Sequence, residues 1–401
     1  MHPLIHDWNA APTPKPPLVL LNDETLRDGL QSPSVRTPSI EEKLRILHLI
    51  DALGIDTADI GLPGAGPQVV RDVERLAREI VDARLRVAAN CAARTLAADI
   101  RPIAEVSQRV GIPIECCAFI GSSSLRQYAE GWEIAHLLRL TESAIAFAVG
   151  EGLPVMYVTE DTTRAAPDTL RQLYSTAIRA GASRVCISDT VGHATPVGAA
   201  AVVRFVARVV EECGGGVGID WHGHRDRDFA VVYSLAALDA GATRLHGTGI
   251  GIGERVGNTP MDMLIVNLVL MGYLERDLSA LVPYCEAVSA ATGVAIPPNY
   301  PVVGRDAFRT ATGVHAAAVI KAFRKNDQAL ADAIYSGVPA SLVGRAQEIE
   351  IGPMSGKSNV IFWLEKRGLP VTDDIVDRIF AKAKGASSVL EEREILAVLK
   401  G

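Results

Sequence analysis

The sequence is poor in aromatic residues and cysteines and has no apolar segment long enough to cross a membrane. Aromatic residues make up 5% of the 401 residues, and the six cysteines show no CxxC or CxxH spacing, which argues against a cysteine-based metal site. We expect small buried thiols in a reducing compartment. The most apolar predicted helix, at 261–274, carries Asp262 and Asn267 and is too short to span a bilayer. Residues 1–17 lack the apolar core of a signal peptide, so we expect a cytoplasmic protein without a membrane partner.

An excess of positive charge is also missing. The formal net charge is −7 and the isoelectric point is near 5.8, which gives no reason to expect a nucleic-acid partner. Hydrophobic residues make up 48% and charged residues 22% of the chain, as in ordinary soluble globular proteins. The length suits a barrel of about 250 residues followed by a smaller appended region.

Short apolar runs alternate with longer amphipathic stretches through the first two thirds of the chain. About eight such units in a row predict a parallel sheet covered on both sides. A doubly wound sheet is the competing fold, but it needs a GxGxxG motif after its first strand, which is missing. We therefore predict an α/β protein with a TIM (β/α)8 barrel. The expected strands are 18–22, 57–61, 85–90, 112–120, 153–159, 184–188, 217–222 and 244–247, and the clearest expected helices are 39–53, 68–81, 132–149, 167–180, 196–211 and 226–240.

The βα rhythm stops near Leu274, and helical patterns joined by a proline-rich segment follow. We expect a small, mostly helical C-terminal region after the barrel. The predicted divisions are an N-terminal arm (1–16), the barrel (17–275), a helical subdomain (276–342) and a second C-terminal subdomain (343–401).

Polar motifs stand where three of the predicted strands end. TLRDGLQ at 25–31 follows the first strand, His222-Gly223-His224 ends the seventh, and GIGERVGN at 251–258 follows the eighth. Strand C-termini build the active site of a TIM barrel. Two histidines spaced i, i+2 on a strand point to the same side and suit a divalent metal ion when a carboxylate joins them. Taken alone, such a pair is more often a packing or surface feature.

Together these motifs resemble the DRE-TIM metallolyase family. The segments TEDTTR (159–164) and DTVG (189–192) are further matches, and Gly313-Val314-His315 with Tyr335 resembles the appended region of the 2-isopropylmalate and homocitrate synthase branch. The resemblance implies condensation of acetyl-CoA with a 2-oxo acid to a 2-hydroxy dicarboxylic acid plus CoA. It also implies a divalent metal (Mn, Zn, Mg or Co), acetyl-CoA as co-substrate, and a homodimer with exchanged C-terminal regions.

Carried over to this chain, the resemblance assigns a role to each site residue. Arg27 would be the cation beside the reacting carbonyl, with a surface ion pair as the alternative. Glu254 is expected to hold a neighbouring loop or a histidine ring. For the glycines of 249–257 we favour a tight turn over a phosphate cradle, and we expect His48, His136, His193 and His246 to be packing or surface residues. The remaining assignments are Asp28, His222, His224 and Asn258 for the metal, Glu160, His315 and Tyr335 for catalysis with Arg27, and Gln31, Arg126 and Thr190 for the substrate.

Departures from the family pattern leave the substrate open. Arg225 replaces an amide and Asp228 a glycine beside the histidine pair. Arg126 suggests a second substrate carboxylate and therefore 2-oxoglutarate, whereas TEDTTR resembles 2-isopropylmalate synthases. We favour 2-isopropylmalate synthase acting on 2-oxoisovalerate, with homocitrate or citramalate synthase as alternatives.

Two other classes of protein remain open. Gly29-Leu30-Gln31 resembles hydroxymethylglutaryl-CoA lyase, but 247–258 lacks that lyase's cysteine. A carbon–carbon lyase or aldolase and a non-catalytic barrel are the rival classes. We also expect no leucine-type regulatory domain, because the sequence ends at residue 401.

Overall fold

The computed structural model describes residues 3–9 and 15–400. Part of the predicted N-terminal arm, residues 1–2 and 10–14, lies outside the described residues. The chain forms two compact units. The larger comprises Pro14–Arg276 and Ala280–Ala295, and the smaller comprises Met1–Thr13, Asp277–Ser279 and Ile296–Gly401. Each unit is described by itself.

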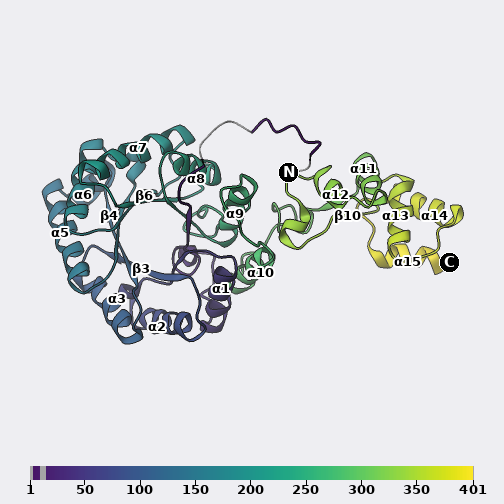
Figure 1. Cartoon of the computed structure of the whole chain (residues 1–401). Coiled ribbons are helices and arrows are strands. Elements are labelled where there is room, and N and C mark those ends of the chain that lie inside the picture. The colour runs from purple at the N-terminus through teal and green to yellow at the C-terminus, as the bar shows by residue number, and fades with distance from the viewer. Residues whose placement is uncertain (1–2, 10–14, 401) are drawn as a thin grey trace. The chain divides into compact units, whose positions relative to one another are not determined.

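The larger unit is a closed barrel of eight parallel strands in sequence order (Figure 1). The last strand pairs with the first, with Leu20 opposite Arg244 and Asp23 opposite Gly247, so the sheet has no free edge. The predicted TIM barrel is confirmed. Its strands are β1 (Leu20–Asp23), β2 (Thr57–Asp59), β3 (Ala88–Arg94), β4 (Glu115–Gly121), β5 (Val155–Glu160), β6 (Arg184–Asp189), β7 (Gly218–Gly223) and β8 (Arg244–Gly247).

Helices form a ring outside the strands (Figure 1). Their apolar faces pack on the sheet, as in α2, where Val73, Leu76, Ala77 and Ile80 are buried. Local caps fix several ends: Ser39 and Glu42 form a reciprocal capping box at the start of α1. The helices of this unit are α1 (Ile40–Ala52), α2 (Pro67–Asp82), α3 (Ala97–Val110), α4 (Ser124–Glu130), α5 (Ile134–Gly150), α6 (Pro167–Arg179), α7 (Pro196–Glu212), α8 (Ala230–Asp239), α9 (Met261–Leu270) and α10 (Leu281–Thr292).

Two predicted boundaries are wrong for identifiable reasons. The third strand was expected at 85–90 but begins at Ala88, because the Val87 backbone N–H donates to the Asp51 side chain (3.0 Å) instead of joining the sheet. The helix expected at 226–240 begins at Ala230. Asp228 stands before it with φ +58°, a left-handed conformation that cannot continue a helix.

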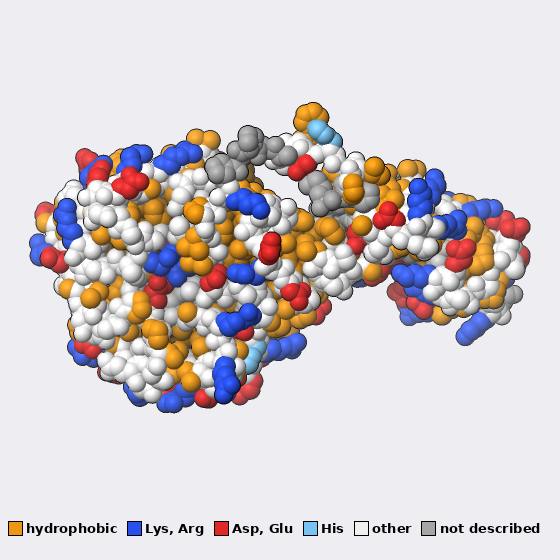
Figure 2. Space-filling view, viewed as in Figure 1, with side chains coloured by type: hydrophobic (Ala, Val, Ile, Leu, Met, Phe, Trp, Pro, Cys, Tyr) orange, Lys and Arg blue, Asp and Glu red, His pale blue; other side chains and the backbone are white. Residues whose placement is uncertain are grey.

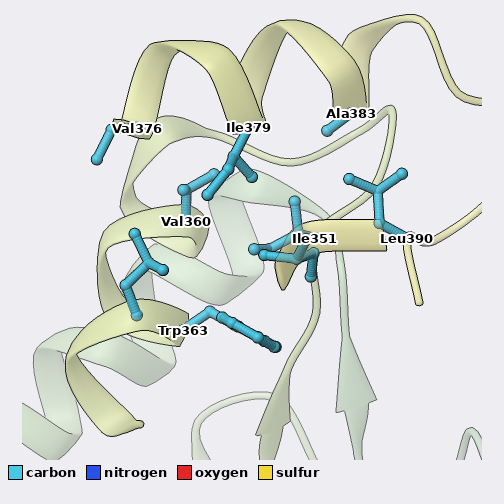
Figure 3. Close-up of a cluster of buried hydrophobic side chains, with 9 residues drawn as sticks. Ile351, Val360, Trp363, Val376, Ile379, Ala383 and Leu390 are labelled. Atoms are coloured by element: carbon cyan, nitrogen blue, oxygen red, sulfur yellow. The ribbon is translucent and has the colours of Figure 1, made fainter. Parts of the chain in front are cut away.

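The smaller unit is mostly helical, as predicted. Its one pair of short strands among the described residues joins β9 (Arg309–Thr310) to β10 (Glu348–Ile349). Ile351, Val360, Trp363, Ile379 and Leu390 belong to its larger apolar core (Figure 3). The helices are α11 (Gly313–Arg324), α12 (Gln328–Ala333), α13 (Lys357–Lys366), α14 (Asp373–Lys384) and α15 (Glu392–Lys400).

The surface and the helix lengths bear on the environment of the protein. On the face of the barrel unit shown in Figure 2, basic and acidic side chains alternate among apolar and neutral ones. Among the described residues no helix is both long enough and apolar enough to cross a bilayer.

Candidate metal and substrate site

A pocket of about 290 Å³ opens inside the barrel unit, at the C-terminal ends of its strands. Its walls combine two chemistries. One side carries charged and imidazole groups from β1, β7 and β8 and their loops. The other carries apolar and thiol groups from β3 to β6, together with Glu160, Ser188 and Thr190. The lining residues are Glu24, Arg27, Asp28, Gln31, Leu62, Ala92, Cys117, Phe119, Met156, Val158, Glu160, Cys186, Ser188, Thr190, His222, His224, His246 and Glu254.

Three buried ligand atoms converge on the charged side of the pocket. His222 Nε2 lies 3.1 Å from His224 Nε2, and Asp28 Oδ2 lies 3.5 Å and 3.7 Å from these two nitrogens. Burial and the neighbouring His222 lower the pKa of His224 to about 4, so its ring is neutral at physiological pH. Two imidazoles and one carboxylate are a donor set that suits a divalent transition ion. The geometry therefore fits a metal site.

Asn258 lies beside this group. Its Nδ2 donates to Asp28 Oδ2 (2.7 Å), while its buried Oδ1 has no hydrogen-bond partner. A buried amide oxygen without a partner is costly. Half a turn of the amide exchanges its oxygen and nitrogen, so with a cation between the two side chains Asn258 could present its oxygen instead of its donor. This uncommitted amide fits a fourth ligand position.

The glycines of the loop after β8 allow different parts of this loop to lie close together. A Cβ on Gly253 would stand 2.0 Å from Asn258 Oδ1, and a Cβ on Gly257 would stand 1.8 Å from the Gly251 carbonyl oxygen. Both glycines also have positive φ angles, +154° and +102°. The structure therefore agrees with the tight turn that we favoured. The close approach is to Asn258 and to the loop backbone.

Arg27 is a largely buried cation surrounded by carboxylates. Its Nε donates to Asp59 (2.7 Å), and its Nη2 donates to Glu24 (3.1 Å). Its Nη1 lies 3.5 Å from Asp28 Oδ1. Burial would lower the pKa of Arg27, but these carboxylates outweigh it and raise the pKa. The side chain is 18% exposed, so the alternative of a surface ion pair is wrong.

Sequence reasoning missed three residues of this network. Asp59, at the end of β2, holds Arg27, and burial raises the pKa of Asp59 to about 6 despite the cation. Glu24 accepts from His222 Nδ1 (2.7 Å) and from His246 Nδ1 (3.0 Å). The expectation that His246 is a packing or surface histidine is corrected, because its Nε2 also contacts Asp220 (2.8 Å). Burial alone would lower the pKa of His246, but Glu24 and Asp220 raise it to about 9.

A pattern in the sequence could have indicated these residues. Glu24 is part of the same DETLRDG run as Arg27, directly after the first strand. His246 stands on β8 with the inward orientation of Arg244, two residues earlier. Glu24 and His246 are both almost completely buried. The sequence did not show that the ends of three separate strands bring Glu24, His222 and His246 into contact.

The opposite side of the pocket is mostly apolar. Cys117, Met156 and Cys186 form a buried cluster there, with Val158 packed against it. Burial raises the pKa of both cysteine thiols, so they are neutral and behave as small apolar groups. Two lining side chains are cationic near neutral pH, Arg27 and His246.

The structure brings two of the three predicted substrate residues to the pocket. Gln31 and Thr190 line it, together with the predicted catalytic residue Glu160. Thr190 accepts a hydrogen bond from the Asp161 backbone N–H (2.8 Å), and burial raises the pKa of Glu160. Arg126 is not among the lining residues. Its guanidinium lies 3.1 Å from Glu130 and 5.6 Å from the ring centre of Trp132.

Glu254 lines the pocket mouth with a side chain that is 57% exposed. Its nearest ion-pair partner is Arg255, at 4.0 Å. The contact with a histidine ring that we expected of Glu254 is instead made by Glu24. The loop is held by Arg255, which donates to Asp226 (3.0 Å) and to the Thr190 carbonyl (2.6 Å).

Arg225 and Asp228, the two departures from the family pattern, pair with each other at 3.3 Å. The φ of +58° at Asp228 explains why a glycine suits this position in relatives. Arg225 also donates its backbone N–H to the Gly257 carbonyl (2.9 Å), which links the loops after β7 and β8.

His315 and Tyr335 belong to the smaller unit. Their rings stack with centres 4.1 Å apart, although twenty residues separate them in the sequence. Tyr335 is 48% exposed, and its neighbour in sequence Ile334 is 37% exposed. The unit therefore presents an exposed imidazole–phenol pair.

Comparisons with known proteins agree with this site. The HMGL-like family model matches residues 19–287. A homocitrate synthase of Methanopyrus kandleri is 34% identical over 380 residues, covering 92% of this chain and 88% of the relative. A 2-isopropylmalate synthase of Solidesulfovibrio magneticus is 32% identical over 379 residues, covering 91% of this chain and 70% of the relative.

Solved structures support the fold. An HMG-CoA lyase from Bacillus subtilis superposes with a TM-score of 0.58 at 19% identity, covering 71% of this chain and 97% of the lyase. The sequence relatives above are named as synthases, so the prediction of an acyl-transferring enzyme is confirmed. The chain belongs to the HMGL-like family, with relatives among its 2-isopropylmalate and homocitrate synthases.

Proposed function

We propose that this enzyme condenses acetyl-CoA with a 2-oxo acid that carries an apolar side chain, as a 2-isopropylmalate synthase acting on 2-oxoisovalerate. The observation that carries the proposal is the pocket with two faces. Asp28, His222 and His224 converge beside Arg27 on one face, and the other face is mostly apolar. The named synthases among the relatives support the reaction type.

The metal site of the proposal consists of Asp28, His222, His224 and Asn258. A divalent ion bound there would act as a Lewis acid on the ketone of the 2-oxo acid. The donor set suits Mn, Zn, Mg or Co. Asp28 supplies the negative charge, and burial keeps water from competing with the histidine rings for the metal.

Arg27 provides a fixed positive charge next to the reacting carbonyl. Its contacts with Asp59 and Glu24 hold the guanidinium in one orientation, so little reorganisation is needed when negative charge develops on an oxygen. Gln31 and Thr190 line the same pocket and are proposed to orient the substrate.

The acetyl methyl group must lose a proton before it can form a carbon–carbon bond. We propose that His315, stacked on Tyr335, accepts this proton, and that Glu160 takes part in the same proton transfer. Burial raises the pKa of Glu160 towards neutral pH, and a carboxyl exchanges a proton most easily when its pKa lies near the pH of the solution. The enolate carbon then bonds to the ketone carbon, and water cleaves the thioester to release CoA and the 2-hydroxy dicarboxylic acid.

The apolar face favours a branched 2-oxo acid over 2-oxoglutarate. A second carboxylate on the substrate would need a cation. Arg27 already meets three carboxylates, and His246 is held between Glu24 and Asp220. Arg244 lies beside Met156 but is paired with Asp220 and Glu115. A carboxylate placed among Cys117, Met156 and Cys186 would therefore have to compete with existing ion pairs, at a cost of several kcal/mol. Leu62 and Val158 suit the two methyl groups of an isopropyl side chain.

Homocitrate synthase is the second candidate. The argument for it rests on Arg126. This residue lies on α4, which follows β4 directly, and its charge lowers the pKa of Glu160 against the effect of burial. If this side chain left Glu130 it could meet a second carboxylate. Citramalate synthase and a carbon–carbon lyase on the same barrel remain as further alternatives.

We also propose that the active enzyme is a homodimer in which His315 and Tyr335 act with the barrel of the partner copy. Two inactive variants, Arg27→Ala and His315→Ala, test this. If the proposal holds, each mixed dimer has one intact site, and random exchange in an equal mixture makes half of the dimers mixed. The mixture then recovers about a quarter of wild-type activity, whereas each variant alone stays inactive. No recovery after verified subunit exchange contradicts it.

The central experiment is a panel of 2-oxo acids with acetyl-CoA and Mn²⁺, Mg²⁺, Zn²⁺ or Co²⁺, following free CoA thiol. We expect 2-oxoisovalerate to give the highest kcat/KM, ahead of pyruvate and 2-oxoglutarate. Preference for 2-oxoglutarate would support the homocitrate alternative. Thiol release without any 2-oxo acid, or no release with any of them, would contradict the condensation. Cleavage of hydroxymethylglutaryl-CoA would support the lyase.

A further inference from the structure

Glu24, to which the sequence motifs assigned no role, contacts three side chains of the site. Its Oε2 meets His222 Nδ1 at 2.7 Å, and its Oε1 meets His246 Nδ1 at 3.0 Å and Arg27 Nη2 at 3.1 Å. The residue is 2% exposed. Both carboxylate oxygens are therefore engaged, and Glu24 connects a proposed metal ligand, His222, to two groups outside the proposed ligand set.

The contact with Glu24 determines which nitrogen of His222 carries the proton. A carboxylate accepts hydrogen bonds and cannot donate one when ionised, so His222 Nδ1 must hold the hydrogen. Nε2 is then the nitrogen with the free lone pair. It is also the atom that faces His224 Nε2 (3.1 Å) and Asp28 Oδ2 (3.5 Å). The contact thus directs the only available lone pair of the ring into the proposed metal site.

Glu24 is itself held in place by a second set of buried residues. His246 spans from Glu24 to Asp220, with 2.8 Å between its Nε2 and Asp220 Oδ2. Asp220 in turn accepts from Arg184 (2.6 Å) and from Arg244 (2.5 Å). A buried chain of hydrogen bonds therefore runs from strands β6, β7 and β8 through His246 to Glu24. A rotation of Glu24 would break several of these contacts at once.

We infer that Glu24 is a positioning residue, which fixes the tautomer and the ring orientation of His222 so that Nε2 is preset for a divalent cation. The inference rests on the proposed function only in that the cation is the one proposed for that site. Hydrogen bonds to metal-bound histidines typically change metal affinity by about 10- to 100-fold. Glu24 would thus contribute to metal affinity without touching the metal.

Metal affinity is the first measurement. Isothermal titration calorimetry with Mn²⁺ compares metal-free wild type with Glu24→Leu, which removes both acceptor oxygens, and Glu24→Gln, which keeps one. We expect Kd to rise about 10- to 100-fold in Glu24→Leu and by less in Glu24→Gln. Glu79→Leu is the matched control, because Glu79 accepts from His48 Nε2 (2.8 Å) on the outer helices and should leave Kd unchanged. An unchanged Kd in Glu24→Leu overturns the inference.

The tautomer of His222 is the second measurement, and it needs no metal. In ¹⁵N-labelled metal-free wild type, long-range ¹H–¹⁵N correlation spectra should show His222 protonated on Nδ1. A wild-type ring protonated on Nε2 overturns the inference even if Glu24→Leu does not fold. If wild type binds no divalent ion but has the Nδ1 proton, the metal proposal fails while the positioning role of Glu24 stands.

Discussion

The Nε2 atoms of His222 and His224 face each other at 3.1 Å in the barrel mouth, and the pKa of His224 is lowered to about 4 by burial and by His222. At neutral pH the ring of His224 therefore carries no positive charge to balance the nearby Asp28 carboxylate. When both Nε2 atoms present their lone pairs, two imidazoles and a carboxylate meet without a donor and repel one another. A cation between them removes this repulsion, so the arrangement favours metal binding.

Metal binding should stabilise the fold, and the effect should depend on Asp28. With Mn²⁺ at 100 times its Kd, the free energy of unfolding should rise by about 2.7 kcal/mol, and EDTA should reverse the gain. Asp28→Asn removes the only negative charge among the three converging ligands and should lose most of this gain. Differential scanning calorimetry with and without Mn²⁺ measures it. Asp168→Asn, on the outer helix α6, serves as control. Equal stabilisation of Asp28→Asn would refute the assignment.

Arg27→Lys keeps the positive charge but loses the planar fork that meets Asp59 and Glu24 at the same time. The ammonium group would lie displaced from the oxygen on which charge develops. We expect kcat to fall about 10²- to 10³-fold, as for the loss of one preorganised donor. Steady-state kinetics with the best 2-oxo acid measures the change. Arg78→Lys, on the outer face of α2, should keep wild-type kcat. A loss confined to KM would assign Arg27 to substrate binding alone.

The barrel could be predicted from the sequence because its signals are local. The strands are short apolar runs, several of which follow a glycine at a helix end, such as Gly54 and Gly181. The last strand, β8 (Arg244–Gly247), has the predicted bounds. The start of β3 could not be predicted, because it depends on Asp51, 36 residues earlier in the chain, which binds the Val87 backbone. Boundaries fixed by such long-range contacts leave no trace in the local pattern.

The residues of the site also divide into those that the sequence could predict and those that it could not. Arg27, Asp28, His222 and His224 stand in motifs at strand ends, and the barrel brings them together. Glu24 and His246 were missed because their importance lies in contacts 198 and 222 residues apart in the sequence. A lone buried histidine has no signature until its partners are known. The same limit applies to Arg126, which the sequence could place after β4 but could not orient.

The loop after β8 should tolerate no side chain at Gly257. In Gly257→Ala the new Cβ would overlap the Gly251 carbonyl oxygen, and the φ of +102° adds strain. We expect a loss of roughly 3 kcal/mol in the free energy of unfolding. Gly216→Ala is the matched control, since Gly216 has a φ of +77° and open space around its Cβ position. It should lose only about 1 kcal/mol. Urea denaturation measures both, and equal losses would show that the loop can rearrange.

Asp23 should make the stability of the enzyme depend on pH. It is fully buried and accepts hydrogen bonds from Tyr284 and from the Thr25 backbone, yet burial raises its pKa from an ordinary 3.8 to about 6. A carboxyl whose pKa is higher in the folded state stabilises the fold while it is protonated. The contribution is fully present below about pH 4 and is lost as the pH rises through about 6.

Asp23→Asn isolates this effect, because it carries no charge at any pH and keeps an acceptor oxygen for Thr25. All other titrating groups are shared, so they largely cancel in the difference between the two proteins. We expect the free energy of unfolding of Asp23→Asn, relative to wild type, to increase by about 1–2 kcal/mol between pH 5 and pH 8. Urea denaturation at half-unit steps of pH measures the difference. A difference that stays constant over this range, or that decreases, would mean that Asp23 is already ionised at pH 5 and that Tyr284 and Thr25 stabilise its charge.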